Sequence, residues 1–159
     1  MSNTVSSPDF RRARVNEAAL LSEIALTGKQ YWGYPAEWVA LWQHDLMVTP
    51  LYIHREPVHV AEIDGRVIGF VGLATEEDGR HLEHLWLRTE YIGRGFGRAL
   101  FGEAVRLAWA EGVAEVLINS DPNAELFYLK MGAVRIGQEV YQLPGAIRRE
   151  VPLLVYRLR

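Results

Sequence analysis

The sequence predicts a mixed α/β protein in which about four helices flank a mostly antiparallel, twisted sheet. Helical and strand patterns alternate along all 159 residues, and no stretch rich in Pro, Gly and Ser divides them. Two Asp-Gly pairs, at Asp64 and Asp78, separate three consecutive strand-like runs, and this dipeptide is the strongest short-range signal for a hairpin. We therefore expect residues 1–159 to form a single domain with antiparallel strands at its centre.

One strand and two helices are expected at the start of the chain. The strand is placed at residues 13–15, and Asn16 can cap a helix that ends near Gly28. Pro35 suits the first position of the second helix, because its fixed φ and missing N–H are tolerated there. Each helix has an apolar face, formed by Leu20, Leu21, Ile24 and Ala25 in the first and by Trp38, Leu41, Trp42 and Leu46 in the second.

An antiparallel meander is expected next, with strands at residues 58–63, 66–75 and 80–87 joined by the two Asp-Gly turns. After a glycine-rich loop, apolar residues recur at helical spacing up to Gly112, which is placed to end that helix. A short apolar strand follows at residues 115–119.

The end of the chain is expected to add one helix and two strands. Asp121 can cap the helix, Pro122 can begin it and Gly132 can end it. The last two strands are placed at residues 133–142 and 150–158.

Composition limits the partners and the chemistry. The formal net charge is −3, so no basic field favours a nucleic-acid partner. The absence of cysteine excludes disulfides, thiolate catalysis and cysteine-bound zinc. No run approaches ~18 apolar residues, and the first residues lack the apolar core of a signal peptide, so we expect a cytoplasmic protein with no membrane partner.

The segment "YIGRGFGRALF", residues 91–101, has glycine at three alternate positions, Gly93, Gly95 and Gly97, and runs into a helical pattern. Alternate glycines allow positive φ and a close approach to the backbone. The helix start behind them offers unpaired N–H groups and a positive dipole end. This arrangement favours an anionic ligand, most often a phosphate.

Two common phosphate-binding motifs do not fit this loop. A P-loop would need Lys and Ser or Thr after Gly97, where Arg98 and Ala99 stand. A Rossmann fingerprint would need a small residue at Arg98 or Leu100, depending on its first glycine. A glycine-rich turn without a ligand remains an alternative.

The segment "HLWLRTEYIGRGFGRALF" resembles the cofactor-binding signature of the GNAT superfamily, the Gcn5-related N-acetyltransferases. A second segment, "NSDPNAELFYLKMGAV", resembles the other signature of that family. The second match rests on Asn123, Ala124, Phe127, Tyr128 and Gly132. The element order fits the GNAT fold over essentially the whole chain.

The resemblance implies transfer of an acetyl group from acetyl-CoA to a small-molecule or peptide amine by direct attack in a ternary complex. It also implies which residues contact the cofactor: Leu85, Trp86, Leu87 and Arg88 beside the pantetheine, Gly93, Arg94, Gly95, Phe96, Gly97 and Arg98 around the pyrophosphate, and Asn123 on the pantetheine arm. Two positions depart from the family pattern, because Ile92 replaces its Gln or Arg and Thr89 its frequent proline. Homodimers are common among similar proteins.

A base and an acid are needed for this chemistry. Strand alternation predicts two faces, with His81, Glu83, Leu85 and Leu87 on one and Leu82, His84 and Trp86 on the other. Glu83, with His81 beside it, is the candidate general base, and a structural carboxylate is the alternative. No metal site is expected, because His81 and His84 fall on opposite faces.

The resemblance makes Tyr128 the candidate acid that faces the thioester sulfur, against a packing role for its ring. The loop "KQYWGY" makes Tyr31, Trp32 and Tyr34 candidates for contacting the acceptor, against simple packing. Two other functions stay open at this point. One is a non-catalytic acyl-CoA-binding module or sensor, and the other is an interaction protein with no ligand in the glycine loop.

Overall fold

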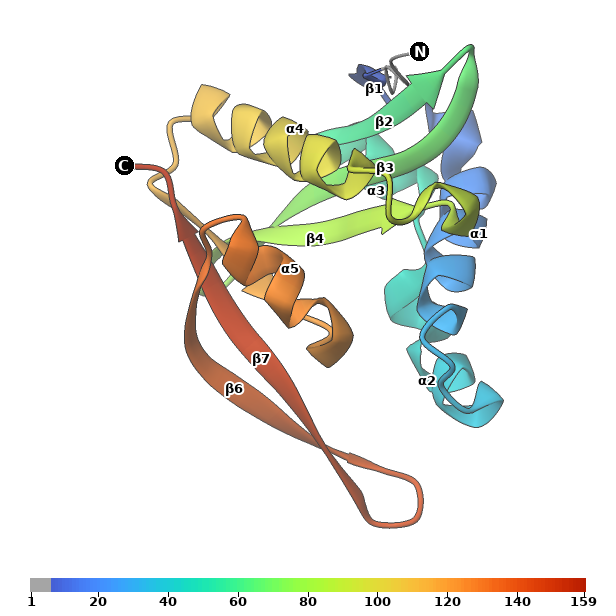
Figure 1. The fold of residues 1–159 in the computed structure, drawn as a ribbon, viewed down its shortest axis with the longest axis vertical. Helices are drawn as coiled ribbons and strands as arrows, with labels where there is room; N and C mark the ends of the chain where they lie inside the picture. Colours follow the sequence, from blue (N-terminus) through green and yellow to red (C-terminus); the bar gives the residue numbers. More distant parts are fainter. Residues whose placement is uncertain (1–6) are drawn as a thin grey trace, which may run out of the picture.

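A seven-stranded sheet, ordered β1-β2-β3-β4-β5-β7-β6, runs through residues 7–159, the part of the chain that this computed structural model describes (Figure 1). The strands are β1 (Asp9–Arg12), β2 (Val58–Ile63), β3 (Arg66–Glu76), β4 (Gly79–Leu87), β5 (Glu115–Asn119), β6 (Val134–Leu143) and β7 (Ile147–Arg157). All neighbouring strands are antiparallel except β4 and β5, which are parallel. The expected mixed, mostly antiparallel sheet is confirmed.

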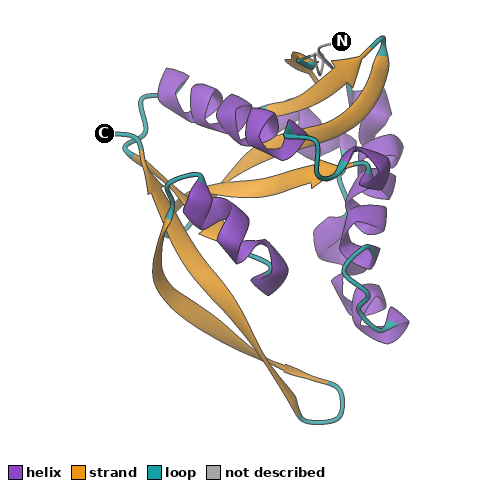
Figure 2. Cartoon of the chain, in the orientation of Figure 1, coloured by secondary structure: helices purple, strands orange, loops and turns teal. Residues whose placement is uncertain are grey.

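Helices cover both faces of this sheet (Figure 2). They are α1 (Ala18–Gln30), α2 (Ala36–Leu46), α3 (Pro50–Arg55), α4 (Phe96–Ala110) and α5 (Glu125–Lys130). One apolar cluster joins α4 and α5 to the sheet, with Leu100, Phe101 and Tyr128 among its members. The other cluster joins α1 and α3 to the opposite face, around Leu21 and Phe70. No helix within residues 7–159 is long and apolar enough to cross a membrane.

Two elements of the structure, β1 and α3, differ from the expected order. The first strand is β1, four residues before the expected 13–15, because β1 pairs in register with β2 and Phe10 lies opposite Ala61. A short helix, α3, was not expected. Thr49 caps it by accepting a hydrogen bond from the Tyr52 amide at 3.1 Å, and Pro50 is its first residue. Its six residues are too few to show a helical period.

Three expected helix boundaries were wrong by one or two residues. Asn16 lies in a 3-10 turn, Val15–Glu17, and does not cap α1, which continues past Gly28 to Gln30. Pro35 precedes α2 and is not its first residue.

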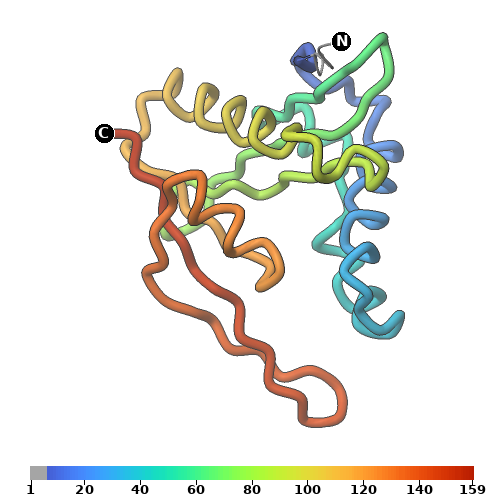
Figure 3. Tube along the Cα trace, viewed as in Figure 1, coloured from blue at the N-terminus to red at the C-terminus, as the bar shows by residue number. Residues whose placement is uncertain are grey.

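Both Asp-Gly turns join the meander of β2, β3 and β4 as expected. The helix expected after Asp121 is divided into a 3-10 turn, Pro122–Ala124, and α5. β6 and β7 form a long hairpin that extends beyond the other strands (Figure 3).

The parallel strands β4 and β5 separate soon after they meet. They share one register pair, His81 with Leu117, near the start of β4. Beyond it, the C-terminal half of β4 pairs with β3 on one edge and leaves the edge toward β5 without a strand partner. Figure 1 shows β4 running toward the start of α4 while the chain after β5 turns into α5. The candidate site lies where these two strands separate.

Candidate functional site

The glycine loop forms the start of α4 in a backbone conformation that favours glycine. Gly93 has φ 84° and Gly95, the residue that precedes the helix, has φ 87°. A side chain at either position would meet no protein atom within 4 Å, so these glycines face open space instead of filling a tight contact. The positive φ, and not a close contact with another part of the protein, therefore explains why glycine stands at both positions. A loop of this kind lets a ligand approach its backbone.

Backbone N–H groups collect at this end of α4. Within residues 7–159, the six amides from Gly93 to Arg98 donate to no protein acceptor, and the first helical bond here runs from Ala99 N–H to Gly95 C=O at 3.4 Å. Unpaired N–H groups and the positive end of a 15-residue helix together stabilise an anion. The residues present therefore fit a pyrophosphate.

The two sequence motifs meet in space. Gly97, in the first turn of α4, lies so close to α5 that a Cβ there would be 3.3 Å from Phe127 Cε2. Leu85 and Leu87 of β4 pack in the same apolar cluster as Tyr128. The start of α4, β4 and α5 therefore lie next to one another in the fold.

A β-bulge in β4 changes the expected alternation. Gly72 of β3 pairs with His84 and Leu73 pairs with Leu82, so Glu83 is the extra residue that has no partner. Leu82 consequently packs on the α4 face, although alternation predicted it on the opposite face. The expected composition of the two faces was therefore wrong for Leu82, which shares the α4 face with Leu85 and Leu87. His81 remains close enough to Glu83 to act on its pKa.

Other side chains of β4, and that of Arg88 after it, are held by contacts within the protein. Burial lowers the pKa of His84 to about 4, so its ring is neutral and accepts a hydrogen bond from Trp86 Nε1 at 3.1 Å. The Trp86 ring packs so closely on α1 that a Cβ at Gly28 would lie 2.6 Å from Cε3. The Trp86 carbonyl lies on the β3 side of the strand, beside Gly69, so Trp86 presents neither its side chain nor its carbonyl at the free edge of β4. The side chain of Arg88 donates to the Val67 carbonyl at 2.6 Å, which holds the end of β4 against β3.

The two candidate bases differ in whether their side chains already have a hydrogen-bond partner. His81 is buried, and its Nε2 lies 2.6 Å from Asp78 Oδ1, so this nitrogen is already hydrogen-bonded within the protein. Glu83 is exposed, and its carboxylate has no hydrogen-bond or ion-pair partner in the described part of the chain. Partial loss of hydration raises the pKa of Glu83, and the nearby Glu76 carboxylate raises it further. A free carboxylate with a raised pKa is suited to accept a proton near neutral pH.

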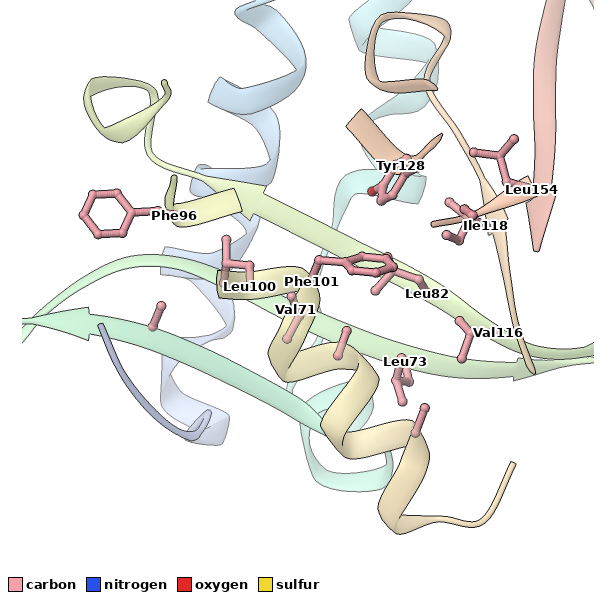
Figure 4. Packing of buried hydrophobic residues seen from close by; sticks show 14 of the residues in the cluster. Val71, Leu73, Leu82, Phe96, Leu100, Phe101, Val116, Ile118, Tyr128 and Leu154 are labelled. Carbon is pink, nitrogen blue, oxygen red and sulfur yellow. The ribbon is translucent and has the colours of Figure 1, made fainter. Parts of the chain in front are cut away.

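Tyr128 has a buried ring, and its hydroxyl has no protein partner. The ring packs against Phe127 at 5.1 Å and Phe101 at 6.0 Å between centroids. The hydroxyl makes no hydrogen bond within residues 7–159, yet it is not among the fully enclosed polar atoms there. Figure 4 shows it on the side of the ring away from Ile118 and Leu154. Burial raises the pKa of Tyr128, so the phenol stays protonated and can donate.

Asn123 and Tyr34 belong to a polar cluster instead of standing free. The Asn123 amide donates to Tyr34 Oη at 2.9 Å and to Asp121 Oδ1 at 3.1 Å. Tyr34 in turn donates to Asp121 at 2.9 Å. Lys29 and Arg149 reach the same carboxylate from α1 and β7.

The three aromatic residues expected at the acceptor do not act as a unit. Tyr31 and Trp32 are 51% and 39% exposed and pack edge to face on each other. Tyr34 turns away from them toward the Asp121 cluster. Lys29, Asp121 and Arg149 were not expected to be functional, because 92 and 28 residues separate the charged partners and no local motif marks them.

A cavity of about 400 Å³ lies next to this cluster. Its walls come from α1, α2, the end of β5 and the β6–β7 hairpin. It includes Lys29, Asp121 and Arg149. The loop aromatic residues Tyr31 and Trp32 do not line it. No group of three potential metal-binding side chains occurs in residues 7–159.

Known structures share this fold. The GCN5-related N-acetyltransferase of Rhodopseudomonas palustris superposes with a TM-score of 0.80 at 20% identity, over 99% of this chain and 100% of that chain. PaiA N-acetyltransferase from Thermoplasma acidophilum, solved in complex with coenzyme A, gives 0.72 at 22% identity, over 96% and 99%. YncA from Salmonella typhimurium, solved with its cofactor acetyl-CoA, gives 0.69 at 16% identity, over 97% and 95%.

No curated protein sequence matches this chain. A family model, described as acetyltransferase (GNAT) domain, matches residues 36–143. That range includes the glycine loop, the bulged strand β4 and the whole of α5. The chain therefore belongs to the GNAT acetyltransferase domain family.

Proposed function

We propose that this protein transfers the acetyl group of acetyl-CoA to a primary amine by direct attack within a ternary complex. The observation that carries the proposal is the set of six unpaired amides at the start of α4, placed beside the unpaired edge of β4. A pyrophosphate on the amides would let the pantetheine run along β4 as an added strand does. Two neighbours of the same fold were solved with CoA and with acetyl-CoA, which supports CoA as the ligand.

The chain's own residues supply the proton transfers. Bound acetyl-CoA supplies a thioester, which is an activated acetyl group. Glu83 accepts a proton from the ammonium form of the acceptor, which leaves the nitrogen lone pair free to attack. Tyr128 donates a proton to the departing sulfur.

The bonds and protons balance over the reaction. A bond forms between nitrogen and the acetyl carbonyl carbon, and the bond between that carbon and sulfur breaks. Nitrogen loses two protons, of which one passes through Glu83 to solvent and the other replaces the proton that Tyr128 gives to sulfur. The products are an amide and CoA as a thiol.

Thermal melts test the cofactor part of this proposal. A ligand that binds only the folded protein at a hundredfold excess over Kd adds about 2.7 kcal/mol of stability. For a domain of this length that corresponds to a rise in Tm of roughly 5–10 °C. Acetyl-CoA should give this rise and NAD should give none. Equal, negligible shifts with acetyl-CoA, dephospho-CoA and NAD would refute CoA binding.

Release of CoA thiol in the presence of an amine panel tests the catalytic part. Release that depends on an acceptor supports transfer. A rise in Tm with acetyl-CoA but no release with any amine would instead favour a non-catalytic acyl-CoA-binding module.

A further inference from the structure

The cavity beside the Asp121 cluster has a charge pattern that selects among amines. It opens between the helices α1 and α2 and the β6–β7 hairpin, next to the last residues of β5. Cationic, anionic and apolar side chains all line its wall. Its volume of about 400 Å³ exceeds what a simple alkylamine would fill.

Two cations in this wall share one carboxylate. Lys29 Nζ lies 2.6 Å from Asp121 Oδ2, and Arg149 Nη2 lies 3.4 Å from the same oxygen. The three side chains are only 12%, 11% and 10% exposed, for Lys29, Arg149 and Asp121 respectively. The cluster therefore carries one excess positive charge in a place with little water. An uncompensated charge in such a place is costly, so a further anion would be strongly favoured there.

The same cations keep donors for that anion. Arg149 donates hydrogen bonds from Nη1 to Tyr34 Oη at 3.2 Å and from Nη2 to Asp121 Oδ2 at 3.4 Å. Its Nε–H has no acceptor within residues 7–159. Lys29 uses one of its three N–H donors in the hydrogen bond to Asp121. Both groups are fixed over the Trp42 ring, at 4.6 Å from its centroid. Donors held in place by aromatic faces and ion pairs bind a carboxylate with little loss of side-chain freedom.

The opposite charge is found elsewhere in the same wall. Asp45 of α2 lines the cavity and has no ion-pair partner within 4 Å in the described chain. Asp45 is close enough to Glu83 to contribute to the raised pKa of that residue. The cavity wall thus contains one carboxylate, Asp45, that attracts a cation, and two cations, Lys29 and Arg149, that attract an anion.

We infer that the acceptor is a zwitterionic amino acid, whose carboxylate binds Arg149 and Lys29 while its ammonium group lies toward Asp45 and Glu83. This inference rests on the proposed function, and it names the substrate class of that site. The carboxylate takes no part in the bond changes and only orients the nitrogen. The apolar part of the wall, formed by Leu41, Leu46, Leu143 and Val151, fits an apolar side chain on the amino acid.

A polyamine acceptor fits the cavity less well. Its first ammonium would suit Asp45, but its second would approach the excess charge of Lys29 and Arg149. Like charges brought close together in a poorly hydrated site repel each other. Diamines therefore serve as a contrasting acceptor class in the test.

Acceptors that lack the free carboxylate of leucine, and a diamine as the contrasting class, test the inference in the wild-type protein. Leucine would be compared with isopentylamine, with leucine methyl ester and with a diamine of similar length. Charge-assisted hydrogen bonds to a carboxylate correspond to an advantage of about 10- to 100-fold. We expect kcat/KM for leucine to exceed that for each of the other three by this factor. An equal or higher value for isopentylamine or for the diamine would overturn the inference.

Neighbouring arginines provide matched variants. Arg149→Gln should lower kcat/KM for leucine by about 10- to 100-fold and should change the value for isopentylamine by much less. Arg148→Gln is the control, because Arg148 lies next in the same strand, is 61% exposed and pairs with Glu150 at the surface. A loss of equal size for both acceptors in Arg149→Gln would mean that Arg149 only supports the fold. Arg149→Lys keeps the charge and tests the same contrast if the glutamine variant does not fold.

Product binding separates this inference from the proposed function. N-acetylleucine keeps the carboxylate, whereas N-isopentylacetamide lacks it, and neither requires turnover. Calorimetric titration should show binding of N-acetylleucine at least tenfold tighter, in the presence of CoA, and loss of that preference in Arg149→Gln. If no amine is acetylated but this preference is found, acetyl transfer fails and the carboxylate site stands. If amines are acetylated without this preference, the carboxylate site fails and acetyl transfer stands.

Discussion

Replacing Tyr128 by phenylalanine removes one oxygen and tests the proposed acid. Its ring contacts with Phe101 and Phe127 do not involve the hydroxyl, which has no protein partner in residues 7–159. A lost internal hydrogen bond typically costs about 0.5–1.5 kcal/mol, and here none is lost. We therefore expect the free energy of unfolding to change by less than about 0.5 kcal/mol, or Tm by less than about 2 °C.

Turnover should fall much more than stability. General acid assistance is typically worth ~10²–10⁴-fold. Because a thiol is already a fairly good leaving group, the lower end is expected, so kcat should fall about 100-fold, which corresponds to roughly 2.7 kcal/mol. Burial raises the pKa of Tyr128, so the phenol stays protonated through neutral pH. The loss should therefore be uniform across the pH profile.

The assay follows CoA thiol release at saturating acetyl-CoA between mildly acidic and mildly alkaline pH. The thermal shift caused by acetyl-CoA in the same variant serves as the control for binding. Unchanged kcat, or a loss explained entirely by weaker acetyl-CoA binding, would refute the acid role and leave Tyr128 as a packing residue.

Three further predictions concern the backbone, the base and the core. Gly95→Val should reduce the acetyl-CoA thermal shift, because the new side chain enters the space where the phosphate approaches. The φ of 87° also costs a non-glycine residue about 1–2 kcal/mol, which disfavours this loop conformation. An undiminished shift would contradict this. Glu83→Gln should flatten the rising limb of the pH–rate profile, and an unaltered profile would exclude Glu83 as the base. Since the pKa of Glu83 is raised in the fold, its contribution to stability is lost as pH rises through that pKa, so the variant should gain stability relative to wild type at higher pH in denaturant titrations. Gly28→Ala should destabilise the protein by about 1–3 kcal/mol, because its Cβ would lie 2.6 Å from the Trp86 ring, whereas the control Gly102→Ala, a helical position with nothing within 4 Å, should stabilise it by about 0.4–1 kcal/mol; equal effects in chemical denaturation would contradict the packing argument.

Local signals predicted most of the fold. The meander could be found because an Asp-Gly pair and the strands beside it are adjacent in the chain, and α4 because its apolar stripe spans four turns. The position of β1 could not be found this way, since its register depends on pairing with β2, which lies about fifty residues away. The bulge at Glu83 likewise arises from the pairing of β4 with β3 and leaves no mark in the local pattern.

The candidate site divides in the same way. The two motifs predicted the α4 amides and Tyr128, because each lies within one continuous segment. The cluster of Lys29, Asp121 and Arg149 brings together three separate elements, so the sequence showed Asp121 only as a helix cap. Long-range ion pairs depend on the completed fold, and periodicity carries no information about them.

The most direct test of acetyl transfer follows the acetyl group itself. The protein would be incubated with acetyl-CoA that carries an isotopic label in its acetyl group and with a panel of primary amines that includes leucine. Mass spectrometry would then identify the labelled product and count it against the CoA released. The proposed function predicts one labelled amide for each CoA. Release of CoA with the label recovered as acetate, or no release while acetyl-CoA still raises Tm, would contradict it.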